Sequence, residues 1–469
     1  MKAPPITIVG AGLVGALLAA LLAQRGFKVS VFERRPDPRK AGFLGGRSIN
    51  LALAERGWHG LRVAGMQERM RPIAVMMRGR MVHDIDGRTN LQRYGRDDSE
   101  VIWSVSRGVL NMALLDAAEA AGATIHFDQR LDAVDWKTST LHLRSEDETT
   151  RAHEAGVILG TDGAGSALRA AMALETDLGE RFEPLGHGYK ELEIPALGDF
   201  PAGTLPRNLV DALARGERYA MEPHALHIWP RGNYMCIALP NAEGSFTVTL
   251  FLPNLGEPSL ESVVTSAQAR AFFQRDFADA VPLIPDLEKD YVGNPTGLLG
   301  TLYLDRWHID GRALLLGDAS HAIVPFHGQG MNSGFEDAVE LADLLEASPD
   351  DSAGAFAEFE RRRKPNADAI AAMALENYVE MRDRVDDADY LLMRELDRTL
   401  AGRHPGRWVP RYWMVTFSRV PYQLAFERGE IQAQLLREFI AGRQTLAEVD
   451  LERADRLVHE RLDMLPVSA

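Results

Sequence analysis

Ile6-Thr7-Ile8-Val9-Gly10-Ala11-Gly12-Leu13-Val14-Gly15 is the stretch that decides the fold. Its first four residues predict a buried strand, residues 10–15 a turn, and residues 13–25 an apolar helix. Residues 29–32 predict a second strand, which ends at Glu33 and completes a β-α-β unit. Glycines permit a tight turn and the close approach of a pyrophosphate, and the helix N-terminus offers free N–H groups. The stretch therefore predicts a dinucleotide site with Glu33 on a ribose, without separating NAD from FAD.

Two further motifs place an aspartate beside glycine. Gly317-Asp318 follows the apolar run 313–316, and an aspartate at the carboxyl end of a parallel strand points into the ligand crevice. The glycine-rich loop 325–332 comes next and enters a predicted helix over 331–345, whose N-terminus can stabilise negative charge. The third motif is Gly160-Thr161-Asp162-Gly163, in which Asp162 could pair with Arg169. Taken alone, this third motif favours a β-turn with a surface ion pair over a ligand site.

Composition narrows the class of protein. The net charge is −15, from 52 basic and 67 acidic residues, which argues against nucleic acid and anionic membranes as partners. Cys236 is the single cysteine, so an internal disulfide and a cysteine-based metal cluster are excluded, and a reducing cytoplasm is expected. The apolar run 13–22 falls short of the roughly 20 residues that span a bilayer. No metal site is predicted.

The middle and the end of the chain have different patterns. Residues 189–194, 225–229, 234–239 and 246–252 alternate or run apolar between turn residues, which predicts an antiparallel sheet and a separate substrate lobe. Residues 353–398 are rich in Ala, Glu, Arg and Leu and predict helices. Pro405, Pro410 and Pro421 interrupt the helical pattern after residue 398, and residues 427–469 are charged throughout.

The three glycine-containing motifs, in this order, resemble those of the flavoprotein aromatic hydroxylases of the p-hydroxybenzoate hydroxylase type. The resemblance implies an α/β fold with a Rossmann-type FAD-binding domain (residues 1–180 and 290–365), a β-sheet substrate lobe (181–289) and a C-terminal helical domain that acts as a cap (366–469). It implies non-covalent FAD, with Asp318 on the ribityl chain and the helix from near Met331 aimed at the flavin. The positions that the resemblance assigns to the cofactor are Gly10, Gly12, Leu13, Val14, Gly15, Glu33, Arg34, Arg47, Arg107, Leu131, Asp162, Asp318, Gly330, Met331 and Asn332.

Further blocks resemble the kynurenine 3-monooxygenase family, among them residues 46–53, 75–81, 94–96, 187–192, 325–332 and 376–378. The resemblance implies that Arg80 and Tyr94 hold the carboxylate of kynurenine, and that Asn377 and Tyr412 complete the polar end. It places Pro325, Phe326, His327 and Gln329 near the flavin, with no single catalytic acid or base. The apolar pocket is implied at Leu226, Met235, Ile237, Leu239, Thr249, Phe251, Pro325 and Phe326. Eukaryotic members carry a hydrophobic C-terminal anchor that this charged C-terminal stretch does not resemble.

The implied reaction is the NADPH- and O2-dependent 3-hydroxylation of L-kynurenine through a flavin C4a-hydroperoxide, by a cytoplasmic enzyme for which a homodimer is the candidate assembly. Three alternatives remain open: a related FAD hydroxylase that acts on another aromatic acid, a flavin- or nucleotide-binding regulator without turnover, and a plain NAD dehydrogenase, which would show no bound flavin. Taken without the resemblance, Arg80 would be interpreted as a solvated arginine, and Tyr94 and Tyr412 as buried tyrosines with local partners.

Overall fold

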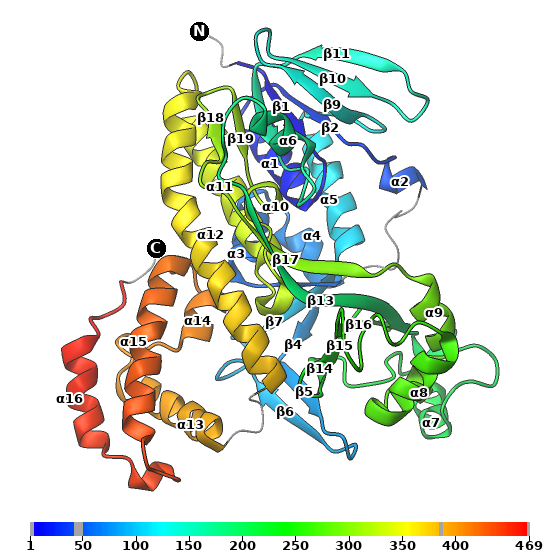
Figure 1. Ribbon diagram of the computed structural model, residues 1–469, viewed down its shortest axis with the longest axis vertical. Helices are drawn as coiled ribbons and strands as arrows, with labels where there is room; N and C mark the ends of the chain where they lie inside the picture. Colours follow the sequence, from blue (N-terminus) through cyan, green and yellow to red (C-terminus); the bar gives the residue numbers. More distant parts are fainter. Residues whose placement is uncertain (1–3, 42–49, 384–387, 467–469) are drawn as a thin grey trace.

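The structure is a computed structural model that describes residues 4–41, 50–383 and 388–466, with the side chains of 381–383 and 388 left aside. Three parts are visible in Figure 1: a part at the top that contains β1, β2 and α1, a second sheet with its own helices at the lower right, and C-terminal helices at the lower left. The α/β class implied by the sequence is confirmed by the sheets and by the helices that cover them.

A six-stranded sheet forms the centre of the upper part. All its neighbouring strands are parallel except the short edge pair β18–β19. Every residue of β1 is buried, as expected for a parallel strand that is covered on both faces. The strand order is β18 (His308–Ile309), β19 (Ala313–Leu315), β12 (Val157–Gly160), β1 (Ile6–Val9), β2 (Val29–Phe32), β8 (Thr124–His126).

Helices and two small sheets complete this part. The predicted helix over 13–25 is α1, which ends at Gln24; ten of its residues are buried, and nine of these belong to the main hydrophobic core. The small sheets are β11 (Thr150–Glu154), β10 (Thr140–Arg144) and β9 (Arg130–Asp135), and β3 (Asn50–Leu53), β7 (Ile102–Ser106) and β4 (Val75–Met77). The helices are α1 (Leu13–Gln24), α2 (Pro38–Ala41), α3 (Glu55–Val63), α4 (Gln67–Met70), α5 (Arg107–Ala120), α6 (Ala167–Ala173), α10 (Asp318–His321) and α11 (Gly330–Ala347).

The second sheet has seven strands and includes segments that the sequence did not assign to it. The strands expected over 189–252 are present, but the hairpin of β5 and β6 joins them, and β5 pairs with β14 in parallel rather than antiparallel fashion. Helices α7 (Val210–Ala214), α8 (Ser266–Asp276) and α9 (Leu287–Gly293) lie at this sheet. The order is β17 (Gly297–Tyr303), β13 (Arg181–Ile194), β16 (Phe246–Pro253), β15 (Met235–Pro240), β14 (Ala225–Pro230), β5 (Gly79–His83), β6 (Thr89–Arg93).

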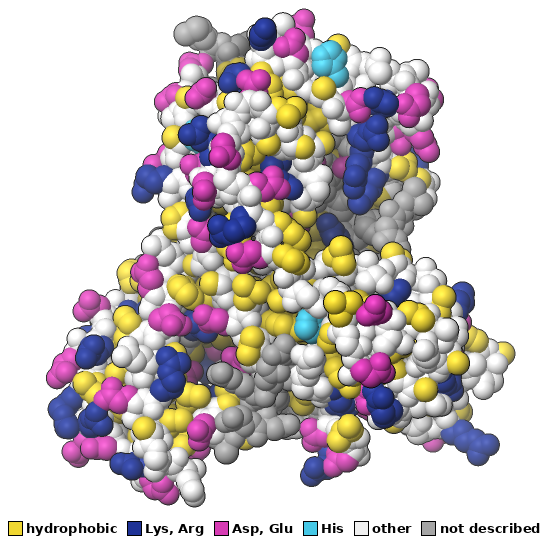
Figure 2. Space-filling model, viewed as in Figure 1, with side chains coloured by type: hydrophobic (Ala, Val, Ile, Leu, Met, Phe, Trp, Pro, Cys, Tyr) yellow, Lys and Arg dark blue, Asp and Glu magenta, His cyan; other side chains and the backbone are white. Residues whose placement is uncertain are grey.

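The long helix α12 (Ser352–Asp383) runs from the upper part down to the seven-stranded sheet (Figure 1). The helices predicted after residue 353 are therefore observed. They continue with α13 (Ala388–Arg403), α14 (Arg411–Thr416), α15 (Tyr422–Ile440) and α16 (Leu451–Arg461). Pro410 and Pro421 stand immediately before α14 and α15, where a missing N–H costs nothing. In Figure 2, positive and negative side chains are interspersed over these C-terminal helices. Among the described residues, no helix is long and apolar enough to cross a membrane.

Candidate active site

All the predicted nucleotide-binding motifs meet at one edge of the six-stranded sheet. The glycine-rich turn follows β1, Glu33 follows β2, Asp162 lies two residues beyond β12, and Asp318 lies three residues beyond β19. Because these four strands are mutually parallel, their carboxyl ends lie side by side, at the edge where α/β sheets bind ligands. The structure therefore brings together motifs that lie more than 300 residues apart in the sequence.

The three glycines of the glycine-rich turn have different surroundings. A Cβ at Gly10 would lie 2.7 Å from the carbonyl oxygen of Thr161, and a Cβ at Gly15 would lie 2.0 Å from that of Gly10. At Gly12, which precedes α1, a Cβ would meet nothing within 4 Å. Gly10 and Gly15 thus serve close packing, whereas Gly12 opens the helix N-terminus to a ligand. Glu33 fixes this turn, because its carboxylate accepts from Ala11 N at 2.8 Å.

The second glycine motif adds an acidic group and a helix N-terminus. Gly317 has a φ of +60°, and Asp318 beside it is exposed at the same edge of the sheet. The 18-residue helix α11 begins at Gly330 and packs closely on the first motif, since a Cβ at Gly334 would lie 2.5 Å from Val14 Cγ2. These features fit the ribityl and ring portions of FAD.

The remaining positions that the resemblance assigned to the cofactor differ in their exposure. Arg34 is exposed and Arg107 is half-buried, so both side chains can reach a ligand. Leu131 is buried in the core, which leaves only its main chain for a ligand. Arg47 lies outside the described residues.

Like Glu33, two further predicted polar side chains are already engaged by the protein. The carboxylate of Asp162 accepts from Ser166 Oγ and from the amides of Ala167 and Leu168, so it caps α6. The suggested pairing of Asp162 with Arg169 is therefore wrong. Arg169 instead donates to two carbonyls and lies 3.1 Å from Glu180, because the capped helix carries it toward that carboxylate.

The amide of Asn332 is also saturated. Its Oδ1 accepts from Ala54 N and Gly57 N, and its Nδ2 donates to the carbonyls of Ala52 and Gly328. Any contact of Asn332 with the cofactor is left to its main chain.

The predicted substrate residues share one face of the seven-stranded sheet. Ile237 pairs with Thr249 across neighbouring strands, and Met235 pairs with Phe251. Arg80 of β5 is the register partner of Leu226 in β14. Alternate residues of the same strands point to the opposite face, where Cys236, Ala238 and Leu250 pack with α8 and α9 in a separate core. One face therefore builds the core of the lobe, and the other carries the predicted substrate residues of these strands.

The polar end of this face is a cluster of Arg80 with aromatic rings. The guanidinium carbon lies 5.7 Å from the ring centroid of Tyr94 and 5.8 Å from that of Tyr412. The two tyrosine rings stack at 5.7 Å, although they come from the segment after β6 and from α14. Within the part of the chain that the structure describes, no carboxylate forms an ion pair with Arg80, although Glu380 of α12 lines the same hollow.

Arg80 remains protonated in its buried position. Burial lowers the pKa of Arg80, but the oxygens of Tyr94, Tyr412 and Glu380 outweigh that effect and raise it. The arginine is therefore a permanent cation at the end of the pocket face.

The loop before α11 packs against the same face of the sheet. Phe326 packs against Phe251 at 5.0 Å and Tyr378 at 4.3 Å, and its carbonyl accepts from Asn377 Nδ2 at 2.6 Å. Pro325, which opens this loop, is exposed.

His327 of the same loop reaches the polar end. Its ring stacks on that of Tyr412 at 5.7 Å. Burial lowers the pKa of His327 to about 4, and its buried Nδ1 has no hydrogen-bond partner in the described part of the chain. The imidazole is therefore neutral near pH 7.

The apolar lining forms two neighbouring clusters that share members. Leu226 and Ile237 pack both against the cluster that holds Met235, Phe251 and Phe326 and against the cluster that holds Leu239. Tyr94 belongs to the second cluster as well. An aromatic ring that entered between them would have apolar side chains on several sides and Arg80 at one end.

Two residues of the site are not among the site positions predicted from the sequence, although Glu191 lies in the block 187–192 that carries the family resemblance. Glu191 is the register partner of Thr249, so it lies on the pocket face one strand further along. Burial raises the pKa of Glu191 to about 7, although Arg107 acts in the opposite sense. Phe417 packs against Tyr412 and the second apolar cluster. The alternation of β13 could have indicated Glu191, whereas Phe417 follows a helix of only six residues and has no sequence signal.

Known proteins share both the sequence and the fold. The family model described as "FAD binding domain" matches residues 4–186 and 297–374. The chain is 56% identical over 462 residues to the kynurenine 3-monooxygenase of Xanthomonas axonopodis pv. citri (strain 306), covering 98% of this chain and 97% of that protein. It is 53% identical to the kynurenine 3-monooxygenase of Stenotrophomonas maltophilia (strain K279a), with the same coverage.

Solved structures support the fold. The tetrameric form of 2-methyl-3-hydroxypyridine-5-carboxylic acid oxygenase is similar with a TM-score of 0.63 and 19% identity, over 84% of this chain and 96% of that one. PqsL from Pseudomonas aeruginosa, a probable FAD-dependent monooxygenase, is similar with a TM-score of 0.60 and 21% identity, over 81% of this chain and 97% of that one. At this identity the likeness concerns the fold alone.

Proposed function

The chain belongs to the kynurenine 3-monooxygenase family of FAD-dependent aromatic hydroxylases, and on that premise we propose that it hydroxylates L-kynurenine to 3-hydroxykynurenine with NADPH and O2. The observation that carries the substrate is Arg80. Its guanidinium lies among aromatic rings and forms no ion pair with a carboxylate of the described residues. Because an unpaired desolvated charge is costly, this position favours the binding of an anionic group of a ligand. The planar guanidinium can meet both oxygens of an amino-acid carboxylate.

Tyr94 and Tyr412 give this end its shape. Their stacked rings flank the arginine, and burial raises the pKa of both phenols, so both remain neutral hydrogen-bond donors. With its carboxylate on Arg80, the substrate extends along the sheet face, and its aromatic ring lies among Ile237, Thr249 and Phe251. Carboxylate and pocket together fix which ring carbon faces the cofactor, and such positioning is the protein's main contribution to catalysis in a cofactor enzyme.

The FAD would be held by the glycine-rich turn, Glu33, Asp318 and the N-terminus of α11. When bound and reduced by NADPH, it supplies the oxygen-activating chemistry. The role of the chain's own residues is to keep water out and to hold charge.

The loop before α11 serves that role in two ways. Phe326, Phe251 and Tyr378 pack the wall next to the loop and exclude water. Neutral His327 keeps Nδ1 available for a hydrogen bond inside the wall.

The direct test is product analysis. FAD-loaded protein is incubated with kynurenine and NADPH in air, and the products are identified by mass spectrometry. We expect 3-hydroxykynurenine in an amount close to the NADPH consumed. NADPH consumption stimulated only by another aromatic acid would favour the related hydroxylase, and the absence of any product with every acid would favour a regulator without turnover.

Three finer expectations remain predictions. A homodimer as the assembly, the cytoplasm as the location and the individual residue assignments all rest on the resemblance and on composition. Size-exclusion chromatography coupled to light scattering would measure the assembly directly.

A further inference from the structure

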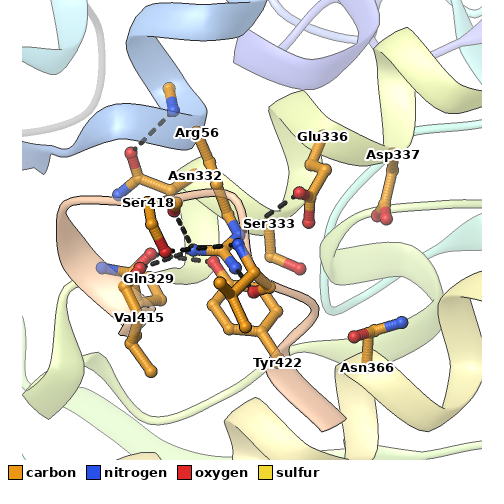
Figure 3. Close-up of polar contacts among 12 residues, drawn as sticks. Arg56, Gln329, Asn332, Ser333, Glu336, Asp337, Asn366, Val415, Ser418 and Tyr422 are labelled. Atoms are coloured by element: carbon orange, nitrogen blue, oxygen red, sulfur yellow. Dashed lines mark hydrogen bonds and ion pairs between the residues drawn. The ribbon is translucent and has the colours of Figure 1, made fainter. Parts of the chain in front are cut away.

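A buried arginine outside the pocket connects the C-terminal helices to the nucleotide-binding part. Arg56 of α3 is 1% exposed, and its Nη1 donates to the carbonyls of Val415 at 2.5 Å and Ser418 at 2.8 Å. Its Nη2 donates to the carbonyl of Val420, and its guanidinium lies 3.8 Å from the ring centroid of Tyr422. Figure 3 shows the guanidinium above this ring, between Val415 and Ser418 on one side and Glu336 on the other.

The carbonyls that Arg56 binds lie immediately beyond the substrate end of the site. Val415 is in the last turn of α14, whose final carbonyls have no partner within the helix, so a cation there completes the helix end. Tyr412 lies one turn earlier in the same short helix. Phe417 packs on Tyr412 and on the second apolar cluster. In the sequence it lies between Val415 and Ser418, the two residues whose carbonyls accept from Arg56 Nη1.

The other side of Arg56 leads toward the cofactor motifs. Its Nε lies 3.2 Å from Glu336 of α11, and Glu336 also pairs with Arg363 of α12 at 2.6 Å. Arg363 pairs with Asp337 at 2.7 Å, and Asp337 accepts from the amide of Gly317 at 3.1 Å. Since Gly317 precedes Asp318, direct contacts run without a break from the loop after Tyr412 to the ribityl motif.

A second tie runs in parallel. The hydroxyl of Tyr422 donates to Gln329 Oε1 at 2.8 Å, and both side chains are buried. Gln329 is the residue before α11, so the start of α15 is fixed to the same loop that carries Phe326 and His327. Arg56 and Tyr422 together join the three elements that must meet around substrate and flavin.

We propose that Arg56 is a positioning residue that holds Tyr412 and Phe417 against the pocket by closing the end of α14 and tying it to α11. The inference deepens the proposed function and rests on it for the identity of the substrate. Loss of the guanidinium frees the segment 411–421, so the carboxylate end of the pocket loosens while the cofactor motifs keep their own contacts.

Arg428 provides a matched control. It is likewise a buried arginine, here of α15, and it donates to the carbonyls of Arg407 and Asp463, each at 2.5 Å. None of these groups lies on the pocket face, so Arg428→Lys removes buried bonds from an arginine to main-chain carbonyls without the connection to Tyr412. Arg56→Lys keeps the charge beside Glu336 but not the planar fork that reaches three carbonyls. Tyr422→Phe keeps the ring and removes only the tie to Gln329.

The test combines hydrogen exchange with substrate binding in FAD-loaded protein. We expect Arg56→Lys to speed amide exchange in residues 411–421 by about tenfold or more, and Arg428→Lys to leave that segment unchanged. Arg56→Lys and, more weakly, Tyr422→Phe should raise the dissociation constant for kynurenine and lower the ratio of product to NADPH consumed, with FAD affinity within about threefold of wild type.

If Arg56→Lys only lowers the melting temperature, as Arg428→Lys does, and leaves exchange at 411–421 and kynurenine binding unchanged, the proposal is overturned. Should Arg56→Lys fail to fold, Tyr422→Phe decides in the same way through exchange, binding and the product ratio. The exchange measurement needs no substrate. If the wild-type protein makes no 3-hydroxykynurenine, the proposed function is rejected. If Arg56→Lys nevertheless exchanges residues 411–421 faster than wild type, the positioning role of Arg56 still holds.

Discussion

The glycine-rich turn after β1 and the Arg80 cluster on the seven-stranded sheet both offer positive potential to a ligand, but they are built from different parts of the chain. The turn uses main-chain N–H groups of one continuous segment, residues 10–15, at the start of α1. The Arg80 cluster uses side chains from β5, from the segment after β6 and from α14. A site built from main-chain N–H groups should therefore tolerate most substitutions around it but not an added Cβ that fills the ligand's space. A site built from side chains should lose its ligand when a single key side chain is removed.

The largest effect is expected from adding bulk to the turn. Gly12→Ala places a Cβ where nothing lies within 4 Å, so the fold should persist, but that methyl group occupies the space where the pyrophosphate approaches. We expect FAD affinity to fall by on the order of 100-fold or more, with an unchanged melting temperature of the FAD-free protein. Flavin fluorescence titration measures the affinity. Gly198→Ala, which also meets nothing within 4 Å, is the matched control. Equal FAD affinity in both variants would remove the turn from the cofactor site.

The next effect is expected at Arg80. Arg80→Met should keep FAD but weaken kynurenine binding by about 2–5 kcal/mol, the usual range for removing one partner of a buried charge pair. Because the substrate is then held less firmly, more of the reduced flavin should react with O2 to give hydrogen peroxide instead of hydroxylated product. The ratio of product to NADPH consumed should therefore fall. Arg78→Met is the control, because Arg78 pairs with Asp98 at 2.9 Å near the surface. Tight kynurenine binding and full coupling in Arg80→Met would show that the substrate lies elsewhere.

A smaller effect is expected at Tyr94. Tyr94→Phe removes one neutral hydrogen-bond donor beside Arg80 and keeps the stacked ring, so kynurenine binding should weaken by about 1 kcal/mol. Because the two residues serve one carboxylate, the same change made in Arg80→Met should cost less than in wild type. Isothermal titration of the four proteins measures this coupling. Fully additive costs would argue that Tyr94 does not share a ligand group with Arg80.

The smallest effect concerns pH and Glu191. Its pKa of about 7 lies above the ordinary value of 4.5, so this carboxyl favours the folded state most at low pH. That advantage is lost as the pH rises from about 4.5 through about 7. Glu191→Gln should therefore lose less stability than wild type between about pH 5 and pH 8, by about 1 kcal/mol because the group is partly solvated. Urea unfolding at both pH values measures it, with exposed Glu183→Gln as control. Identical pH dependence in wild type and Glu191→Gln would contradict the buried setting.

The two regions also differ in how far they can be predicted. The turn, Glu33 and Asp318 are identifiable from local pattern, because each motif follows a strand whose apolar run is visible in the sequence. Arg80, Tyr94 and Tyr412 are identifiable only through the resemblance to a family, since without it Arg80 would be interpreted as a solvated arginine and the two tyrosines as buried residues with local partners. The pairing of Asp162 with Arg169 is wrong because a separation of seven residues does not reveal that Asp162 caps the intervening helix.

The β-α-β unit, the alternating strands of the substrate lobe and the helices of the last third could all be predicted from the sequence, because they depend on contacts between residues close along the chain. Three other features follow only from the packing of the whole molecule: the 79–93 hairpin joins the substrate sheet, Glu191 shares the face of Thr249, and Arg56 binds the end of α14. Most of these are encounters between segments that lie far apart in the sequence. Their geometry depends on how two sheets and α12 pack as a whole, which no local pattern contains.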